Sequence, residues 1–249
     1  MFLYLDRDTA IHRLSPITKI IGLVLIFVLP LFSDRPELSL IPLALVGALV
    51  LWAKCWINFR RIWVFLLFLL LFSTALWSVF HREGVPLFRI GPLGVSMASL
   101  LYGLAMGMRL DVMLIAGIVF LSCTRIEEFT VGLRRMGLPF SICFALSLAF
   151  RLVPLFFHRT QIVVEAQKSR GLDLETGGMV SKMRKYVPLL VPIFVSAVRD
   201  TDLLAMALEG KGFGARGDRT YYLEVEMKGR DYGVLGLLTA VDGCFFVFL

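Results

Sequence analysis

The chain has 249 residues, of which 58% are hydrophobic and 18% are charged, and its net charge is +7. Soluble domains carry about a quarter charged residues and under half apolar ones, so this composition excludes an ordinary soluble enzyme or binding domain. The apolar residues come in blocks, which is typical of a protein embedded in a bilayer. Basic loops on the cytoplasmic side of a membrane explain the positive charge without nucleic acid.

Five apolar blocks are expected to cross the membrane as helices, because each approaches the about 20 residues that a span requires. The first is short, and Pro16 and Lys19 are expected to cap it at the membrane surface. The fourth is long enough to tilt, and its charged residues Arg109 and Asp111 should face the interior of the bundle. The five blocks are Ile17–Phe32, Leu38–Trp56, Ile62–Phe80, Leu93–Cys123 and Tyr232–Leu249.

The block Phe140–Phe157 is also apolar enough to cross, so the distribution of basic residues decides its place. If it crossed, the following stretch His158–Arg230, which is rich in Lys and Arg, would lie outside, against the positive-inside rule. We therefore expect this helix to stay on the cytoplasmic side, against the membrane or a partner. The N-terminus is expected to be cytoplasmic for the same reason.

These elements predict an all-α fold, a polytopic membrane helix bundle of about five transmembrane helices with a cytoplasmic module of long helices. The expected division is residues 1–123 for the first spans, 124–230 for the cytoplasmic module and 231–249 for the last span. No segment shows the period of two that indicates a β-strand.

Three helices are expected in the cytoplasmic module. The first is capped by Thr124 and runs to Met136, where Gly137 and Pro139 end it. The second runs from Phe140 to about Arg170, where Gly171 ends it. The third runs from about Met179 to Lys211, after a turn at 176–178. Glycines 210, 212 and 214 end it. Pro188 and Pro192 either kink it or mark a break.

Motifs for catalysis and metal binding are missing from the sequence. It contains no phosphate-binding loop, no nucleophile elbow and no H-E-x-x-H motif. The acidic pair Glu127-Glu128 is interpreted as complementing a helix dipole. The three histidines lie far apart at expected membrane edges; they are His12, His81 and His158. The four cysteines are interpreted as small core residues; they are Cys55, Cys123, Cys143 and Cys244.

Two helix-end motifs share one pattern: Glu165–Gly171 ends the second helix of the module, and Ala205–Phe213 ends the third. Each places a basic residue among small residues at a helix C-terminus, where a cation complements the helix dipole. Two interpretations stay open at this point. The motifs are ordinary glycine-terminated helix ends, or they are two similar sites at which a basic head group enters a partner's acidic cleft.

Segments along nearly the full length resemble the transmembrane T component of energy-coupling factor transporters, the EcfT/CbiQ-like family of ABC importers for vitamins and transition-metal ions. The similar segments are Asp8–Lys19, Gly137–Pro139, Arg151–Pro154, Ala166–Gly171 and Ala205–Phe213 with the trailing Arg219-Thr220. The family's function implies a bacterial inner-membrane protein that is not itself an enzyme.

The resemblance implies two ABC ATPase subunits as partners, one at each helix-end motif. The docking residues would be Ser169, Arg170 and Gly171 in one site, and Gly210, Lys211 and Gly212 in the other. The family typically has alanine–arginine–glycine at these positions, so Ser169 and Lys211 depart from it. Because lysine cannot form a planar bidentate pair, the second contact is expected either to be weaker or to be shared by Arg216.

The third implied partner is a membrane-embedded substrate-binding protein, the S component. Apolar faces around Phe140–Phe157 and Val187–Val198 are expected to hold it and to tilt it between two orientations when ATP closes the ATPases. Expected contact residues are Phe140, Phe144, Arg151, Pro154, Pro188 and Pro192. No metal ion, cofactor or nucleic acid is expected at this chain.

Three other functions compete with this interpretation. A membrane-embedded enzyme, such as a lipid-modifying transferase using Arg109 or Asp111, would need paired acidic residues, whereas Asp242 lies far along the chain. A secondary transporter would show internal repeats, and none is visible. The permease of an ordinary ABC importer would normally carry one coupling segment and not two.

Overall fold

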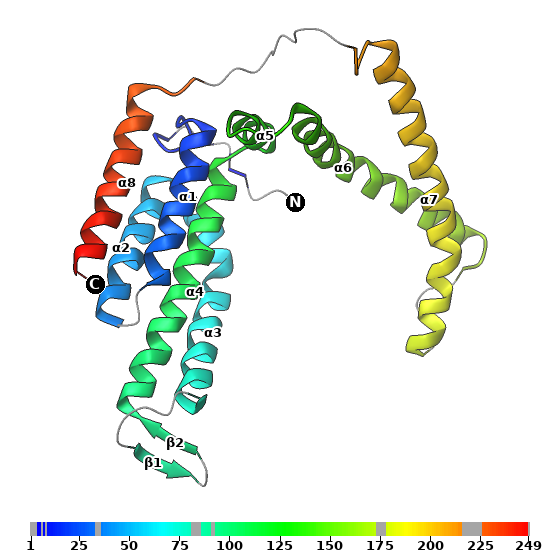
Figure 1. Cartoon of the computed structure of the whole chain (residues 1–249). Helices are drawn as coiled ribbons and strands as arrows, with labels where there is room; N and C mark the ends of the chain where they lie inside the picture. Colours follow the sequence, from blue (N-terminus) through cyan, green and yellow to red (C-terminus); the bar gives the residue numbers. More distant parts are fainter. Residues whose placement is uncertain are drawn as a thin grey trace. The chain divides into compact units, whose positions relative to one another are not determined.

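The computed structural model describes residues 4, 5, 7, 9–32, 36–80, 86–90, 93–172, 178–215 and 226–248 (Figure 1). Almost all of them are helical, which confirms the expected all-α class. In chain order the elements are α1 Pro16–Leu31, α2 Pro36–Trp52, α3 Trp56–Phe80, β1 Pro86–Ile90, β2 Leu93–Ser96, α4 Met97–Cys123, α5 Ile126–Arg135, α6 Phe140–Ser169, α7 Met179–Gly210 and α8 Gly229–Phe248.

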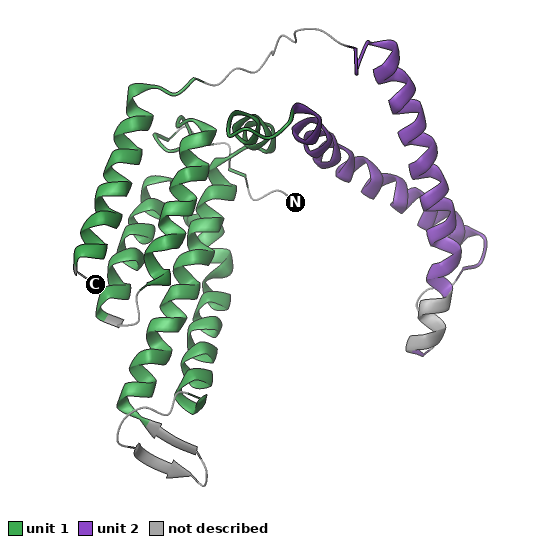
Figure 2. Ribbon diagram, viewed as in Figure 1, with its two compact units in different colours: residues 1–139, 223–249 green, residues 140–222 purple. Residues whose placement is uncertain are grey.

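The chain divides into two compact units (Figure 2). One is a helix bundle formed by Met1–Pro139 and Leu223–Leu249, and the other is a helical hairpin formed by Phe140–Tyr222. The short helix α5 therefore packs with the bundle, on α1. The expected division at residues 123 and 230 concerns the membrane boundary, and it stays a prediction.

Helix α4 is the central helix of the bundle, because α1, α2 and α3 all pack against it. Gly103 and Gly107 let α3 come close: a Cβ built on Gly103 would lie 2.8 Å from the main-chain oxygen of Thr74. Glycines four residues apart share one helix face, and their small size lets two backbones approach each other. Buried valines and isoleucines, among them Val112 and Ile115, complete the core beside this contact.

A short antiparallel hairpin of β1 and β2 precedes α4, with Ile90 paired to Leu93. The expectation that the chain contains no strand is therefore wrong, and the span expected from Leu93 begins at Met97 instead. Ser96 fixes this start through a capping box with Ser99, because each side chain bonds the other residue's main-chain N–H.

Helix α5 begins one residue later than expected. Its N-cap is Arg125, which makes no side-chain capping bond, while Thr124 is the C-cap of α4. The expected end is confirmed, since Gly137 has a φ of +104°. Glu127 and Glu128 lie in the first turn of α5, where negative charge complements the helix dipole.

The ammonium group of Lys19 lies inside the bundle, and its expected place at a membrane surface stays a prediction. Its Nζ donates to the main-chain oxygens of His12 (2.9 Å) and Cys123 (2.8 Å) and forms an ion pair with Glu128 at 3.3 Å. Cys123 and Glu128 lie 104 and 109 positions further along the chain. The three acceptors together replace the water that a buried ammonium group loses.

Hydrogen bonds of the His12 side chain hold the segment before α1 together. The His12 ring hydrogen-bonds to the main-chain oxygen of Leu5 through Nε2 and to the Thr9 hydroxyl through Nδ1. Its burial lowers the pKa of His12 below the ordinary value.

The buried carboxylate of Asp231 at the start of α8 accepts from the main-chain N–H groups of Ser15 (2.8 Å) and Lys228 (2.7 Å). Asp231 therefore fixes the starts of α1 and α8 together.

Three of the described helices, α3, α4 and α6, are long and apolar enough to cross a membrane, and α1 and residues Glu37–Trp52 of α2 form shorter apolar helices. Asp111 is buried in α4, as expected, while Arg109 is only half-buried. Length and composition do not say which of these helices cross. The positions of α6 and α8 relative to the bilayer therefore stay predictions.

Candidate functional site

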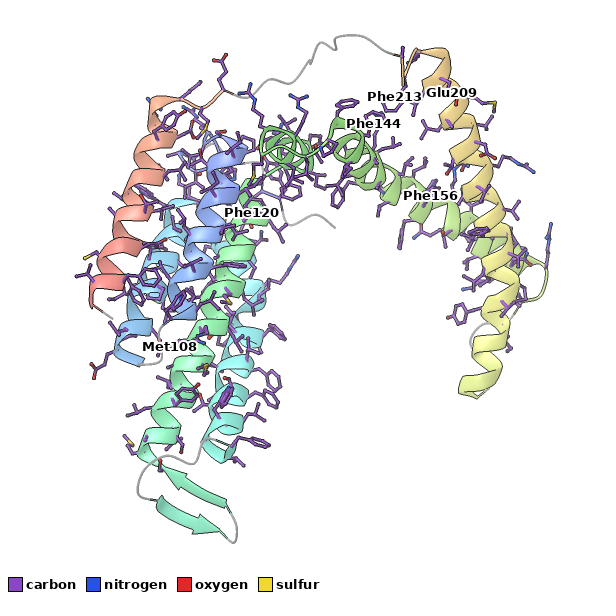
Figure 3. All side chains as sticks on the ribbon, viewed as in Figure 1. Met108, Phe120, Phe144, Phe156, Glu209 and Phe213 are labelled. Atoms are coloured by element: carbon purple, nitrogen blue, oxygen red, sulfur yellow. The ribbon has the colours of Figure 1, made fainter. Side chains whose placement is uncertain are left out.

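The helical hairpin consists of α6 and α7, which run in opposite directions. Near the middle of both helices, Arg159 forms an ion pair with Asp200. There Phe156, Thr160 and Val163 of α6 line a small cavity together with Ile193, Ser196 and Ala197 of α7. At one end of the pair, Phe213 lies beyond the C-terminus of α7 and contacts the start of α6 (Figure 3).

The first helix-end motif closes α6 with a Schellman turn. Gly171 has a φ of +89°, a conformation that glycine adopts without steric cost. The N–H of Gly171 donates to the oxygen of Lys168, and the N–H of Leu172 donates to the oxygen of Gln167, both at 3.0 Å. These two bonds define the turn, in which Arg170 is the C-cap residue. The expected end of α6 at Gly171 is confirmed.

The second helix-end motif closes α7 in the same way. Gly212 has a φ of +77°, and its N–H donates to the oxygen of Glu209 at 2.8 Å. The N–H of Phe213 donates to the oxygen of Leu208 at 2.9 Å. Lys211 is therefore the C-cap residue, in the position that Arg170 occupies on α6. The structure gives the two motifs one local geometry, as their sequences predict.

Helix α5 provides an internal comparison, because it ends in a third turn of this kind. Gly137 donates to Arg134, and Leu138 donates to Leu133, but the C-cap residue is the uncharged Met136. The turn itself is thus a general way to stop a helix. What distinguishes the ends of α6 and α7 is an exposed basic residue at the C-cap.

The head groups of Arg170 and Lys211 are free to reach a partner. Both residues are exposed, and within the described part of the chain neither forms a hydrogen bond or an ion pair through its side chain. The neighbouring Ser169 is exposed too, and its hydroxyl donates to the main-chain oxygen of Glu165. Arg216, the expected auxiliary docking residue, lies outside the described residues.

The two basic residues lie far apart. Phe213, two positions from Lys211, contacts Phe144 near the start of α6, while Arg170 follows the other end of that helix. At a rise of about 1.5 Å per residue, the 26 positions from Phe144 to Arg170 span on the order of 40 Å. Arg170 and Lys211 therefore form two separate sites and not one binding pocket.

The six expected S-component contacts have different environments. Arg151, Pro154 and Pro188 are exposed, and Pro192 is half-buried. Helix α7 runs through both of its prolines, so the alternative of a break there is wrong. Phe140 and Phe144 are half-buried because they pack on each other and on Phe213, a contact that the sequence did not predict.

Metal-ligating residue types and cysteines are further candidates for a functional site. No group of three or more His, Cys, Asp or Glu side chains within them could hold a metal ion. Cys55, Cys123 and Cys143 are buried, as expected for small core residues, whereas Cys244 is exposed; all four are free thiols.

Comparisons with known proteins agree with the resemblance seen in the sequence. The family model CbiQ, described as cobalt transport protein, matches residues 7–222. The energy-coupling factor transporter transmembrane protein EcfT of Heliobacterium modesticaldum is 30% identical over 257 residues, which cover 98% of this chain and 94% of the relative. Its counterpart in Thermosediminibacter oceani is 31% identical, with 92% and 89% covered, and that of Bacillus subtilis is 27% identical, with 98% and 95% covered.

The chain belongs to the EcfT/CbiQ family. It is the transmembrane component of an energy-coupling factor transporter, a multi-pass membrane protein and a non-catalytic subunit. The match with the family covers both helix-end motifs of this T component. Sequence reasoning located these motifs, but it missed the packing of Phe213 against α6 and the buried contacts of Lys19 and Asp231, which join distant parts of the bundle.

Proposed function

We propose that this T component is the scaffold that couples two ABC ATPase subunits to a membrane-embedded S component in the import of a vitamin or a transition-metal ion. One ATPase binds at Arg170 and the other at Lys211. The observation that carries this proposal is the pair of equivalent Schellman turns, each with an exposed basic C-cap residue, on one hairpin. Their separation, on the order of 40 Å, suits two partners better than one.

The chemistry of each end fits an acidic cleft. The last carbonyls of a helix carry partial negative charge, so the cation at the C-cap is stabilised there while its head group extends outward. Gly171 and Gly212 leave no side chain beside it, and a Cβ at either position would meet nothing within 4 Å. Arg170 can form a bidentate pair with a carboxylate, whereas Lys211 offers a point charge, which predicts a weaker second contact.

The S component is the partner that we assign to the apolar surface of the hairpin. Phe194 of α7 is 71% exposed, and Val153 and Phe157 of α6 are more than half exposed. A large exposed apolar surface needs a cover of protein or lipid. We place the hairpin on the cytoplasmic side as part of this proposal, and this placement favours protein, because a helix there does not lie within the hydrocarbon core.

Co-purification tests the docking sites. The detergent-solubilised chain is purified with its ATPases, as wild type and as the double variant Arg170→Glu, Lys211→Glu. We expect the wild type to hold two ATPase copies and the double variant to lose them, because a carboxylate repels an acidic cleft. Arg135→Glu is the control, since this exposed basic residue lies beside the third turn, at Gly137. If the double variant binds as well as the wild type, the docking proposal is wrong.

The same preparation tests the S-component surface. We expect Phe194→Glu to keep both ATPases and to lose the S component, whereas the double variant should show the reverse. Phe194→Leu keeps an apolar side chain and serves as the control. If Phe194→Glu retains the S component, this surface contacts lipid or another protein instead.

The cytoplasmic position of the hairpin is part of the proposal and has its own test. A cysteine at the exposed Lys168, in a chain with Cys244 replaced by serine, should react with a membrane-impermeant maleimide only after the cells are permeabilised. Labelling of intact cells would place the hairpin outside and would contradict the proposed topology.

A further inference from the structure

Phe213 joins the end of α7 to the start of α6. Its ring centroid lies 4.5 Å from that of Phe144 and 6.2 Å from that of Phe140, and those two rings lie 5.8 Å from each other (Figure 3). Rings at these distances attract each other beyond the effect of burial alone. The three rings form a cluster, which we call the aromatic clasp.

The aromatic clasp adds a contact with a second helix to the Schellman turn at the end of α7. The residue after the glycine normally packs back on its own helix, as an apolar side chain near the last turn. Leu172 has this position at the end of α6, and Leu138 has it at the end of α5. Phe213 has it at the end of α7, where its ring contacts the rings of Phe140 and Phe144 on α6, and it follows the docking residue Lys211 by two positions.

We infer that Phe213 is a positioning residue that fixes the Lys211 docking end to the start of α6, so that a displacement of this end moves both helices together. This inference rests on the proposed docking function and extends it. Lys211 makes the contact with the ATPase, and Phe213 passes the movement to Phe140 and Phe144. The central ion pair of Arg159 with Asp200 adds a second link between the helices.

The inference separates two roles: Lys211 binds the ATPase, and Phe213, two residues further on, transmits the movement. Without the clasp, the end of α7 can still present Lys211 to an ATPase, because the turn is held by the main-chain bonds of Gly212 and Phe213. The movement of that end would then be absorbed within the last turn of α7. ATP hydrolysis would continue while transport fell.

The test uses the complete complex of ATPases, T component and S component, reconstituted in vesicles, with the S component's own substrate as the transported probe. For Phe213→Ala we expect two ATPase copies, ATP hydrolysis within twofold of wild type and a loss of transport of at least tenfold. Phe213→Tyr keeps the ring and should restore transport. Phe213→Leu keeps only an apolar side chain after the glycine and should remain impaired.

Leu172→Ala is the matched control, because Leu172 occupies the same position in the turn of α6. We expect it to change transport less than twofold. If Phe213→Ala transports normally, or if Leu172→Ala loses as much, Phe213 has no special role and the inference is overturned. If Phe213→Ala loses an ATPase copy, Phe213 belongs to the docking surface itself, which also overturns it.

A cross-link provides an independent measurement. In a chain without its four native cysteines, Phe144→Cys and Phe213→Cys together remove the ring contact, and a short bifunctional thiol reagent replaces it. We expect transport to be low before the reaction and to recover after it. A further loss on cross-linking would show that the two ends must move apart, and would overturn the inference.

Failure of the docking proposal gives a different result. In that case Arg170→Glu, Lys211→Glu would retain both ATPases, whatever the Phe213 variants do. The cross-link compares the same variant before and after reaction, so it tests the clasp without relying on Lys211 as the docking residue.

Discussion

The bundle and the hairpin bury their side chains in opposite ways. In the bundle, α4 alone contributes eleven buried residues, and buried polar groups such as Lys19 and Asp231 have partners from distant parts of the chain. In the hairpin, Cys143 is the buried residue of α6, and Leu189 is the buried one among the described side chains of α7. The bundle is thus stabilised by its own contacts, while most of the described hairpin side chains stay exposed or half-buried.

This difference indicates where each kind of substitution should act. Changes inside the bundle should lower stability, because they remove packing or leave buried groups without partners. Changes on the hairpin should leave the isolated chain folded and should impair assembly or transport.

The buried cation of the bundle should give the largest effect. We expect Lys19→Met to lower the free energy of unfolding by about 3 kcal/mol, because it leaves the Glu128 carboxylate and two carbonyl groups without their donor. Thermal unfolding in detergent, followed by circular dichroism, measures it. Arg60→Met, an exposed cation on α3, is the control and should change stability by less than about 0.5 kcal/mol. Equal losses in both variants would contradict the role of Lys19.

Two glycines of α4 test the close packing of the bundle. We expect Gly103→Ala to cost about 1–3 kcal/mol, because its Cβ would lie 2.8 Å from the main-chain oxygen of Thr74. Gly117→Ala is the control in the same helix, since a Cβ there meets nothing within 4 Å. Alanine favours a helix over glycine by up to about 1 kcal/mol, so this variant should be neutral or more stable. Unfolding temperatures of the two variants give the comparison, and a stable Gly103→Ala would refute the close approach.

The ion pair of the hairpin should matter less for stability than that of the bundle. Arg159 and Asp200 have side chains that are 45% and 21% exposed, compared with 4% for Lys19. Solvent weakens such a pair to between about 0 and 1 kcal/mol, and Arg159→Gln should stay within that range. Comparing unfolding at low and high salt checks this prediction, because salt should reduce the small difference further. A loss as large as that of Lys19→Met would make the hairpin as self-stabilised as the bundle.

The smallest expected effect is the pH dependence that His12 gives to the bundle. Because burial lowers its pKa in the folded chain, the unfolded chain binds a proton more readily as the pH falls through about 6.5. Stability contributed by neutral His12 is therefore present above that pH and is lost as the pH falls towards the lowered pKa. Unfolding temperatures between pH 7.5 and pH 5.5 should decrease slightly more for the wild type than for His12→Gln. Identical curves would show that His12 does not contribute.

Local patterns in the sequence predicted the helices and the ends of α5, α6 and α7, but not the starts of α3 and α4. Glycine after a basic residue indicated the ends of α6 and α7, because the Schellman turn depends on a few neighbouring residues. The short strands before α4 were missed, and the second of them, β2, continues directly into an apolar run that resembles one long span. The assignment of Thr124 as an N-cap failed because the end of α4 and the start of α5 lie only three residues apart.

Contacts between distant segments could not be predicted from one sequence. Lys19 lies beside an apolar run like any residue at a membrane edge. No neighbouring residue in the sequence indicates that Cys123 and Glu128 provide the hydrogen-bond acceptors of its ammonium group. Phe213 looks like one of many phenylalanines until the antiparallel pairing of α6 and α7 brings it to Phe144. The two helix-end motifs were located because they repeat one short pattern, while their docking role was implied by the family resemblance and stays a prediction.

Native mass spectrometry of single variants tests the central claim, that two separate helix ends each hold one ATPase. The nucleotide-free complex in detergent is measured for wild type, Arg170→Glu and Lys211→Glu. We expect two ATPase copies for wild type and one copy for each single variant, because the sites lie on the order of 40 Å apart along α6. A single variant that keeps both copies, or loses both, would contradict the assignment of one ATPase to each end.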